Sequence, residues 1–64
     1  MMKLETVRAE AQKCANGFGI DYLIVHTASA GYQFMDRSKF NAMDEETKAR
    51  HEIVEEITPQ KTEV

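Results

Sequence analysis

The chain has 64 residues, with eight Lys and Arg against eleven Asp and Glu, and a formal net charge of −3 at pH 7. This length excludes a large enclosed active site and predicts one domain with a marginal core. With 42% hydrophobic and 30% charged residues, the composition is typical of a globular chain. Since the first residues lack the apolar segment of a signal peptide and Cys14 is the only cysteine, we expect a cytoplasmic protein that contacts no membrane.

The first predicted element is a helix over residues 3–15. Leu4, Val7, Ala11, Cys14 and Phe18 recur at spacings of three and four, which places them on one apolar face. Asn16-Gly17 then predicts the end of the helix, because glycine adopts the left-handed conformation of a C-terminal cap.

Two strands are predicted next, over residues 20–28 and 32–39, from their aromatic and β-branched side chains. Between them, residues 29–31 form a short loop in which Gly31 supplies a left-handed backbone conformation. Because a parallel crossover needs about a dozen residues or more, the two strands must form an antiparallel hairpin.

A second helix is predicted over residues 44–57, with Asn41 or Asp44 as its cap and Pro59 ending it. Its inward face would carry Met43, Ala49, Ile53, Val54 and Ile57. The residues expected to be largely buried in the domain are Leu4, Val7, Phe18, Ile24, Phe34, Ile53 and Ile57. The expected fold class is therefore α+β: a single small domain over residues 1–58, in the order α-β-β-α, in which an antiparallel hairpin packs with two helices. Residues 59–64 are expected to form a flexible C-terminal tail.

The charge is uneven along this order. Residues 1–40 carry five basic and four acidic side chains, whereas residues 41–64 carry three basic and seven acidic ones. A solvated helix face accounts for this distribution. The alternative is an acidic helix that binds a partner, because Glu55 and Glu56 would lie in the last turn, where the helix dipole disfavours negative charge.

No catalytic or metal-binding residue is predicted. His51 to Glu55 resembles the helical HExxH zinc motif, but a glutamate replaces the second histidine and no third ligand is evident. Cys14, His26 and Asp36 contain the groups of a nucleophile, a base and an orienting acid, yet Cys14 belongs to the apolar helix face. We therefore expect no enzyme activity, no metal and no cofactor, and keep a metal-dependent enzyme only as an alternative.

A small nucleic-acid-binding module is the other alternative. Tyr22, Tyr32 and Phe34 on the hairpin, with Arg37 and Lys39 nearby, supply groups that stack on bases and contact phosphates. The chain is net negative and lacks a clustered basic surface, so nucleic acid is the less favoured partner.

The hairpin favours assembly with another molecule. With a loop at residues 29–31, Ala28 would face Tyr32, His26 would face Phe34, and Ile24 would face Asp36. Both faces of the hairpin would then be apolar, and both of its edges would be open to strand addition. We therefore predict a homodimer or a docked complex, with the strand over 32–39 at the interface.

The function predicted from these features is non-enzymatic protein–protein interaction. The chain would be a small intracellular regulator or inhibitor of a larger host protein or complex, of the kind that phages and mobile elements encode against host defence. The residues expected to contact the partner lie on the second strand and on the acidic helix: Tyr32, Phe34, Asp36, Arg37, Lys39, Glu45, Glu46, Glu52, Glu55 and Glu56.

Overall fold

A computed structural model describes residues 3–60 of the chain. Within these residues the elements are α1 (Leu4–Phe18), β1 (Tyr22–Thr27), β2 (Gly31–Asp36), α2 (Arg37–Asn41), α3 (Glu45–Ala49) and β3 (Glu52–Ile57). The α+β class is confirmed, whereas the order beyond the hairpin differs from the predicted one. Residues 61–64 of the predicted tail lie outside the described residues.

The long helix α1 forms because apolar residues recur on one of its faces. Val7, Ala11 and Ala15 are buried at intervals of four residues, which keeps them on the side that faces the sheet. The predicted helix is confirmed, but its end at Gly17 is wrong. The left-handed residue is Gly19, with φ 68°, and its N–H donates a hydrogen bond to the Ala15 carbonyl at 2.8 Å.

The predicted helix over 44–57 is replaced by α3 and the strand β3. Ile53, Val54 and Ile57 fit a helical spacing, but they are also β-branched and suit a strand, and short apolar runs are ambiguous in this way. As a strand, the segment pairs antiparallel with β1 and completes a sheet in the order β2-β1-β3. This pairing gives β1 a hydrogen-bonding neighbour on each side, and the hairpin alone leaves one side of β1 open.

The second predicted strand ends earlier than residue 39. The Asp36 side chain accepts a hydrogen bond from the Lys39 backbone N–H at 2.6 Å and so caps α2. Asp44 caps α3 in the same way through the Thr47 N–H at 2.8 Å, which confirms it as a helix cap.

The antiparallel hairpin is confirmed, with its register displaced by two residues. His26 pairs with Tyr32 and Ile24 with Phe34, whereas the predicted partners were Phe34 and Asp36. Because side chains alternate with a period of two, this displacement leaves every residue on its predicted face. Gly31 begins β2 with φ 76°, so its predicted positive φ is confirmed.

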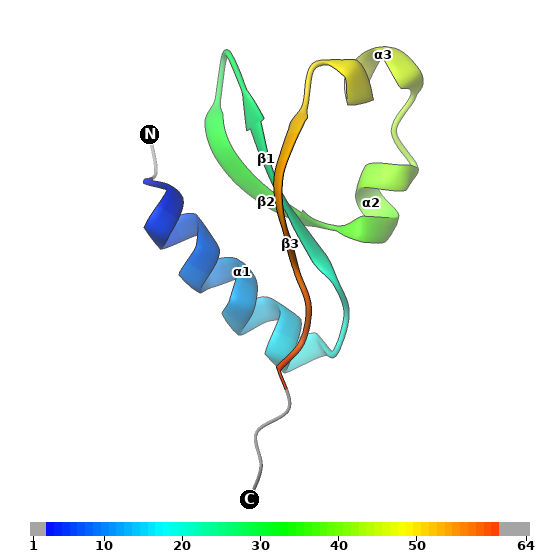
Figure 1. Ribbon diagram of the computed structural model, residues 1–64. Coiled ribbons are helices and arrows are strands. Elements are labelled where there is room, and N and C mark those ends of the chain that lie inside the picture. The colour runs from blue at the N-terminus through cyan, green and yellow to red at the C-terminus, as the bar shows by residue number, and fades with distance from the viewer. Residues whose placement is uncertain (1–2, 61–64) are drawn as a thin grey trace, which may run out of the picture.

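The two faces of the sheet are covered by different helices (Figure 1). On one face, α1 packs Val7, Ala11 and Ala15 against Tyr22 and Ile24. On the other face, Phe40 of α2 packs against Leu23 and Val25 of β1. The helices on both sides leave the outer edges of β2 and β3 as the two edges of the sheet.

Candidate functional site

The predicted aromatic contact residues lie beneath α1. Tyr32 and Phe34 are half-buried and pack against the cluster that α1 forms with β1. The Phe34 ring is 5.9 Å from that of Tyr22, and the Tyr32 ring is 4.9 Å from that of His26. Because α1 covers this face, the aromatic rings do not form the exposed stacking platform that nucleic-acid binding requires.

The acidic residues that were expected on one helix are divided between α3 and β3. Glu45 and Glu46 are exposed on α3, where Glu46 pairs with Arg50 at 3.1 Å. Glu52, Glu55 and Glu56 belong to β3. Glu55 and Glu56 therefore do not lie at the end of a helix, and the unfavourable dipole that suggested a partner-binding role is absent there.

Neighbouring glutamates of β3 form ion pairs on opposite sides of the sheet. Glu55 pairs with Ile24 in the register and reaches Arg8 of α1, whose Nε and Nη2 both lie 2.8 Å from its Oε1. Glu56 pairs with Leu23 in the register and binds Arg37 at the start of α2. These ion pairs join β3 to α1 on one face and to α2 on the other.

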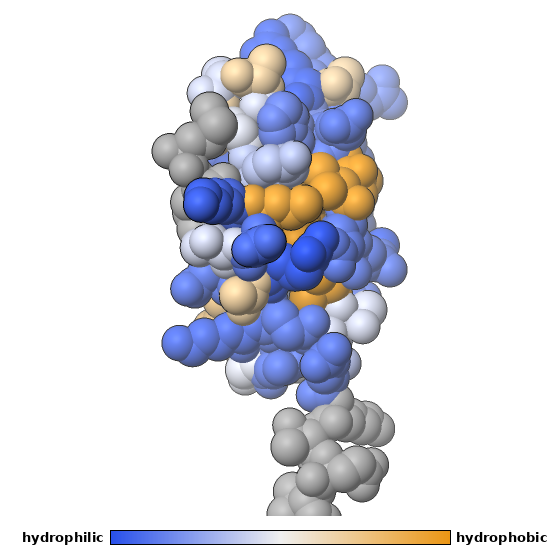
Figure 2. Space-filling model, turned by 60° about the vertical axis from the view of Figure 1, so that its left-hand side comes forward, coloured by the Kyte–Doolittle hydropathy of each residue, from blue (hydrophilic) through white to orange (hydrophobic). Residues whose placement is uncertain are grey.

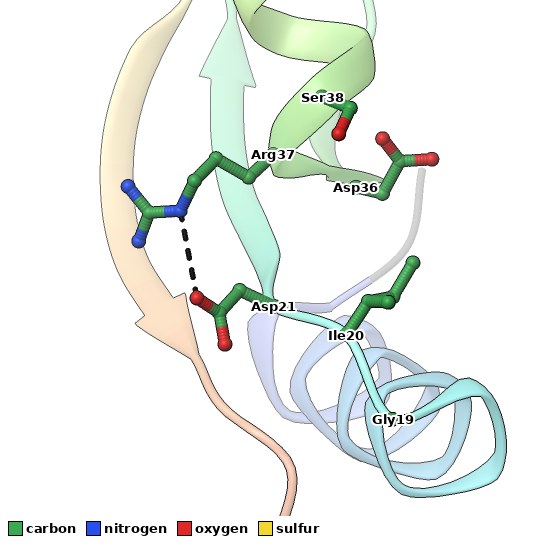
Figure 3. Close-up of a pocket in the computed structure, with 6 residues that line it drawn as sticks. All are labelled: Gly19, Ile20, Asp21, Asp36, Arg37 and Ser38. Carbon is green, nitrogen blue, oxygen red and sulfur yellow. Dashed lines mark ion pairs between the residues drawn. The ribbon is translucent and has the colours of Figure 1, made fainter.

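Arg37 also lines an open hollow of about 400 Å³ beside the turn between α1 and β1 (Figure 3). Its Nε lies 3.6 Å from Asp21 Oδ2, and its backbone N–H donates to the Asp21 carbonyl at 3.2 Å. The remaining lining residues are Gly19, Ile20, Asp36 and Ser38. Since Arg37 binds both Asp21 and Glu56, its positive charge is already compensated, and the structure gives it a role in joining three segments.

Two further predicted contact residues, Asp36 and Lys39, lie at the start of α2. Asp36 uses its Oδ1 to cap that helix, while the Lys39 side chain is exposed. The structure thus pairs Arg37 with Glu56, whereas Asp36 caps α2 and Glu45, Glu46 and Glu52 lie elsewhere on the surface.

The groups considered for nucleophilic catalysis are not brought together. Asp36 pairs with Tyr22 across the sheet, and Cys14 packs against the cluster that contains Tyr22. Burial raises the pKa of Tyr22, and Cys14 and Asp36 raise it further. His26 lies four residues further along β1, or about 13 Å at the usual rise of a strand. Because Asp36 pairs with Tyr22 in the register, this distance excludes a direct hydrogen bond between His26 and Asp36.

The residues of the suspected zinc motif are not one helical turn apart. His51 precedes β3 and Glu55 lies within it. The Nδ1 of His51 lies 2.7 Å from the Thr47 carbonyl oxygen, so this nitrogen donates a hydrogen bond. Among residues 3–60, no three His, Cys, Asp or Glu side chains are grouped as metal ligands.

The exposed apolar residues of β3 were missed by sequence reasoning. Ile53 and Val54, which were expected on the inward face of the second helix, are 52% and 38% exposed. They lie where β3 carries one residue more than β1, between the Ile24–Glu55 and Val25–Ile53 pairs. The sequence signal that could have indicated an edge strand is the pair of adjacent β-branched residues with glutamates on both sides.

The side of the molecule drawn in Figure 2 is largely hydrophilic. Figure 2 shows that the strongly hydrophobic residues visible from that side gather near the middle of the molecule, with hydrophilic residues above and below. Two other large apolar side chains, Phe18 and Ile20, are exposed where α1 passes into β1. Single exposed apolar residues are common on proteins, whereas an apolar pair on an open sheet edge is a recognised kind of interaction site.

Comparisons with protein-family models, curated proteins and solved structures found no match to this chain. Within residues 3–60, no helix has the length and apolar character needed to cross a membrane. The candidate functional site is therefore defined by its geometry: the outer edge of β3, with the exposed Ile53 and Val54 and the acidic side chains of Glu52, Glu55 and Glu56.

Proposed function

We propose that this chain is a non-enzymatic protein-binding module, a small regulator or inhibitor that docks on a larger protein. The observation that carries the proposal is the position of Ile53 and Val54, exposed on a strand at the edge of the sheet. An edge strand presents backbone N–H and C=O groups that can pair with a strand of another chain. Apolar side chains beside these groups add buried area on binding.

The edge of β3 has only partial protection against such pairing. Edge strands are commonly protected by charged side chains, especially lysine, by proline or by a bulge, and the glutamates of β3 oppose pairing with acidic strands but not with basic ones. The six residues of β3 are Glu, Ile, Val, Glu, Glu and Ile, with an irregularity in the register at Val54. The strand contains no lysine or proline, and Pro59 follows it. This composition supports a binding role for the edge.

The small size of the chain supports the same class of function. A core of this size is marginal, and docking on a partner stabilises a folded chain by mass action. We place the protein in the cytoplasm on the basis of its single cysteine, Cys14, which packs against the α1 cluster. Phage and mobile-element inhibitors of host-defence complexes form the class of regulator that we propose for it.

The proposal is tested by affinity capture from the native host with a tagged chain, followed by mass spectrometry. The variant I53K/V54K should lose the captured partner, because two charges replace the apolar part of the edge. The control F18K changes another exposed apolar residue, 72% exposed at the end of α1, and should retain the partner. Circular dichroism establishes that both variants are folded. Retention of the same partner by I53K/V54K would contradict the proposed surface.

A further inference from the structure

We infer that the free edge of β3 receives an extended protein segment in which basic and apolar residues alternate. The inference rests on the proposed function and specifies the chemistry of its partner. Three features carry it: Glu52 and Glu55 on one face of β3, the exposed Ile53 on the other face, where Glu56 is paired with Arg37, and the open edge between the faces.

The acidic side chains are assigned to the α1 side of the sheet by the register. Glu52 pairs with His26 and Glu55 with Ile24, and Ile24 belongs to the cluster beneath α1. Glu52 is exposed. Arg8 contacts Glu55 at Oε1, and the Glu55 side chain is 36% exposed. A cation on a neighbouring strand can therefore approach both carboxylates.

The opposite face of the edge is apolar at its centre. Ile53 pairs with Val25, which packs with Phe40 in the cluster beneath α2. Val54, the additional residue at the irregularity, adds exposed apolar area next to Ile53. An apolar side chain from an added strand would cover this area and remove it from water.

A strand added to β3 projects successive side chains to opposite faces of the sheet. Its residues on the α1 side would lie beside Glu52 and Glu55, and those on the α2 side would lie beside Ile53 and beside Glu56, whose charge Arg37 already compensates. Opposite charges on adjacent strands stabilise pairing, and like charges destabilise it. The complementary sequence therefore alternates Lys or Arg with Val, Ile or a similar apolar residue.

The same charges disfavour a second copy of this chain at the β3 edge. Pairing β3 with itself brings three glutamates of one chain beside three of the other. The net charge of −3 on each chain adds to this repulsion. A basic partner strand relieves the repulsion, which is why the inference commits to a heterologous partner.

The test uses two short synthetic peptides of identical composition, one with alternating Lys and Val and one with Lys and Val in separate blocks. Binding is measured by fluorescence anisotropy at low salt, and the location is determined by NMR shifts of the backbone amides. The alternating peptide should bind roughly tenfold more tightly than the block peptide, a ratio that anisotropy resolves readily. Its largest shifts should fall on β3, and added salt should weaken it, because exposed charge pairs are screened.

Matched variants test whether the peptide contacts both faces of β3. E52Q and I53K should each lower the affinity for the alternating peptide, whereas E45Q, which changes an exposed glutamate of α3, should leave it unchanged. Equal affinity for the two peptides, or shifts centred outside β3, would overturn the inference. If the peptide fails while I53K/V54K still abolishes partner capture, the basic alternating chemistry is wrong and the binding edge remains. If both experiments fail, the proposed function is wrong as well.

Discussion

Val7 lies at the centre of the contact between α1 and the sheet, where its side chain is fully buried. We predict that Val7→Ala lowers the free energy of unfolding by about 1–3 kcal/mol, because it removes two methyl groups and leaves a cavity. Chemical denaturation monitored by circular dichroism measures the change. In a chain this small, such a loss is a large part of the total stability.

Ile53→Thr provides the matched control for this substitution. Ile53 is 52% exposed, and threonine keeps the β-branch that suits a strand. The change in unfolding free energy should stay within about 0.5 kcal/mol. A loss as large as that of Val7→Ala would show that Ile53 is buried in the protein in solution.

Gly31 and Gly17 should respond in opposite directions to a larger side chain. Gly31 has φ 76°, and we predict that Gly31→Val destabilises the fold by about 1–2 kcal/mol, because a β-branched residue is strained there. Gly17 lies in α1 with open space around its Cβ position, so Gly17→Ala should stabilise by up to about 1 kcal/mol. Thermal unfolding of both variants measures the signs, and a neutral Gly31→Val would contradict the positive φ.

At the residue scale, the sequence predicted burial well where the neighbouring elements were correctly assigned. Val7 and Ile24 were expected to be buried and are, because the α1 stripe and the hairpin faces both exist. Phe18 was expected to continue the stripe but is 72% exposed, since it lies at the last residue of α1. The error at Ile53 has a different origin. Its burial was predicted from a helix over residues 44–57, whereas Ile53 lies on the strand β3.

At the element scale, two aspartates determine where short helices begin. Asp44 accepts hydrogen bonds from Thr47, and these bonds hold the pKa of its carboxyl below its ordinary value of 3.8. Because the pKa is lower in the folded state, the ionised carboxylate contributes its full stabilisation at pH values above the ordinary pKa. This contribution is lost as the pH falls through the folded-state pKa. The α3 cap therefore weakens only in acid.

We predict that Asp44→Asn reduces the loss of stability at acidic pH. Asparagine is also a good helix cap, but it does not titrate in this range. Plots of melting temperature against pH should therefore have the same slope for parent and variant above the ordinary Asp44 pKa. Below that pKa the melting temperature of the parent should fall more steeply than that of the variant. Thermal melts across an acid pH series measure both curves, and parallel curves throughout would contradict the role of the Asp44 carboxylate.

The strand order predicts a pattern of hydrogen exchange. β1 has a hydrogen-bonded strand on each side, whereas β2 and β3 each have one. Amides of β1 should therefore exchange more slowly than the outward amides of either edge strand, because exposed backbone groups open locally at low cost. Exchange measured by NMR tests this, and a continuous block of protected amides over residues 44–57 would instead indicate the helix predicted from sequence.

The assignment of β3 could not be made from local sequence alone. Ile53, Val54 and Ile57 match both a helical and a strand pattern, and the choice is made by the open edge of β1, which is a tertiary contact. The predicted site contains the same error, because its acidic residues were placed on the predicted helix. Glu52, Glu55 and Glu56 were predicted to contact a partner from a helix, and their distribution over the two faces of a strand is defined only by the register.

At the scale of the whole molecule, the two edges of the sheet differ in charge. β3 contains three glutamates, whereas β2 contains a single charged residue, Asp36, at its end. Repulsion between glutamates opposes pairing of β3 with its own copy. Pairing of β2 with its own copy meets little such repulsion. From this difference we expect different partners at the two edges, a basic segment at β3 and a second copy of the chain at β2.

We predict a homodimer in which β2 pairs antiparallel with its copy about a two-fold axis, giving one continuous sheet across both chains. Light scattering after size exclusion should show a mass that rises toward two chains as the concentration increases. Gln33→Lys, at an exposed position in the middle of β2, should shift the mass to one chain, because an edge lysine opposes pairing. Ile53→Lys at the other edge should leave the dimer intact. A mass of one chain for the parent protein at every concentration would contradict the dimer, and loss of the dimer with Ile53→Lys but not with Gln33→Lys would place the interface at β3.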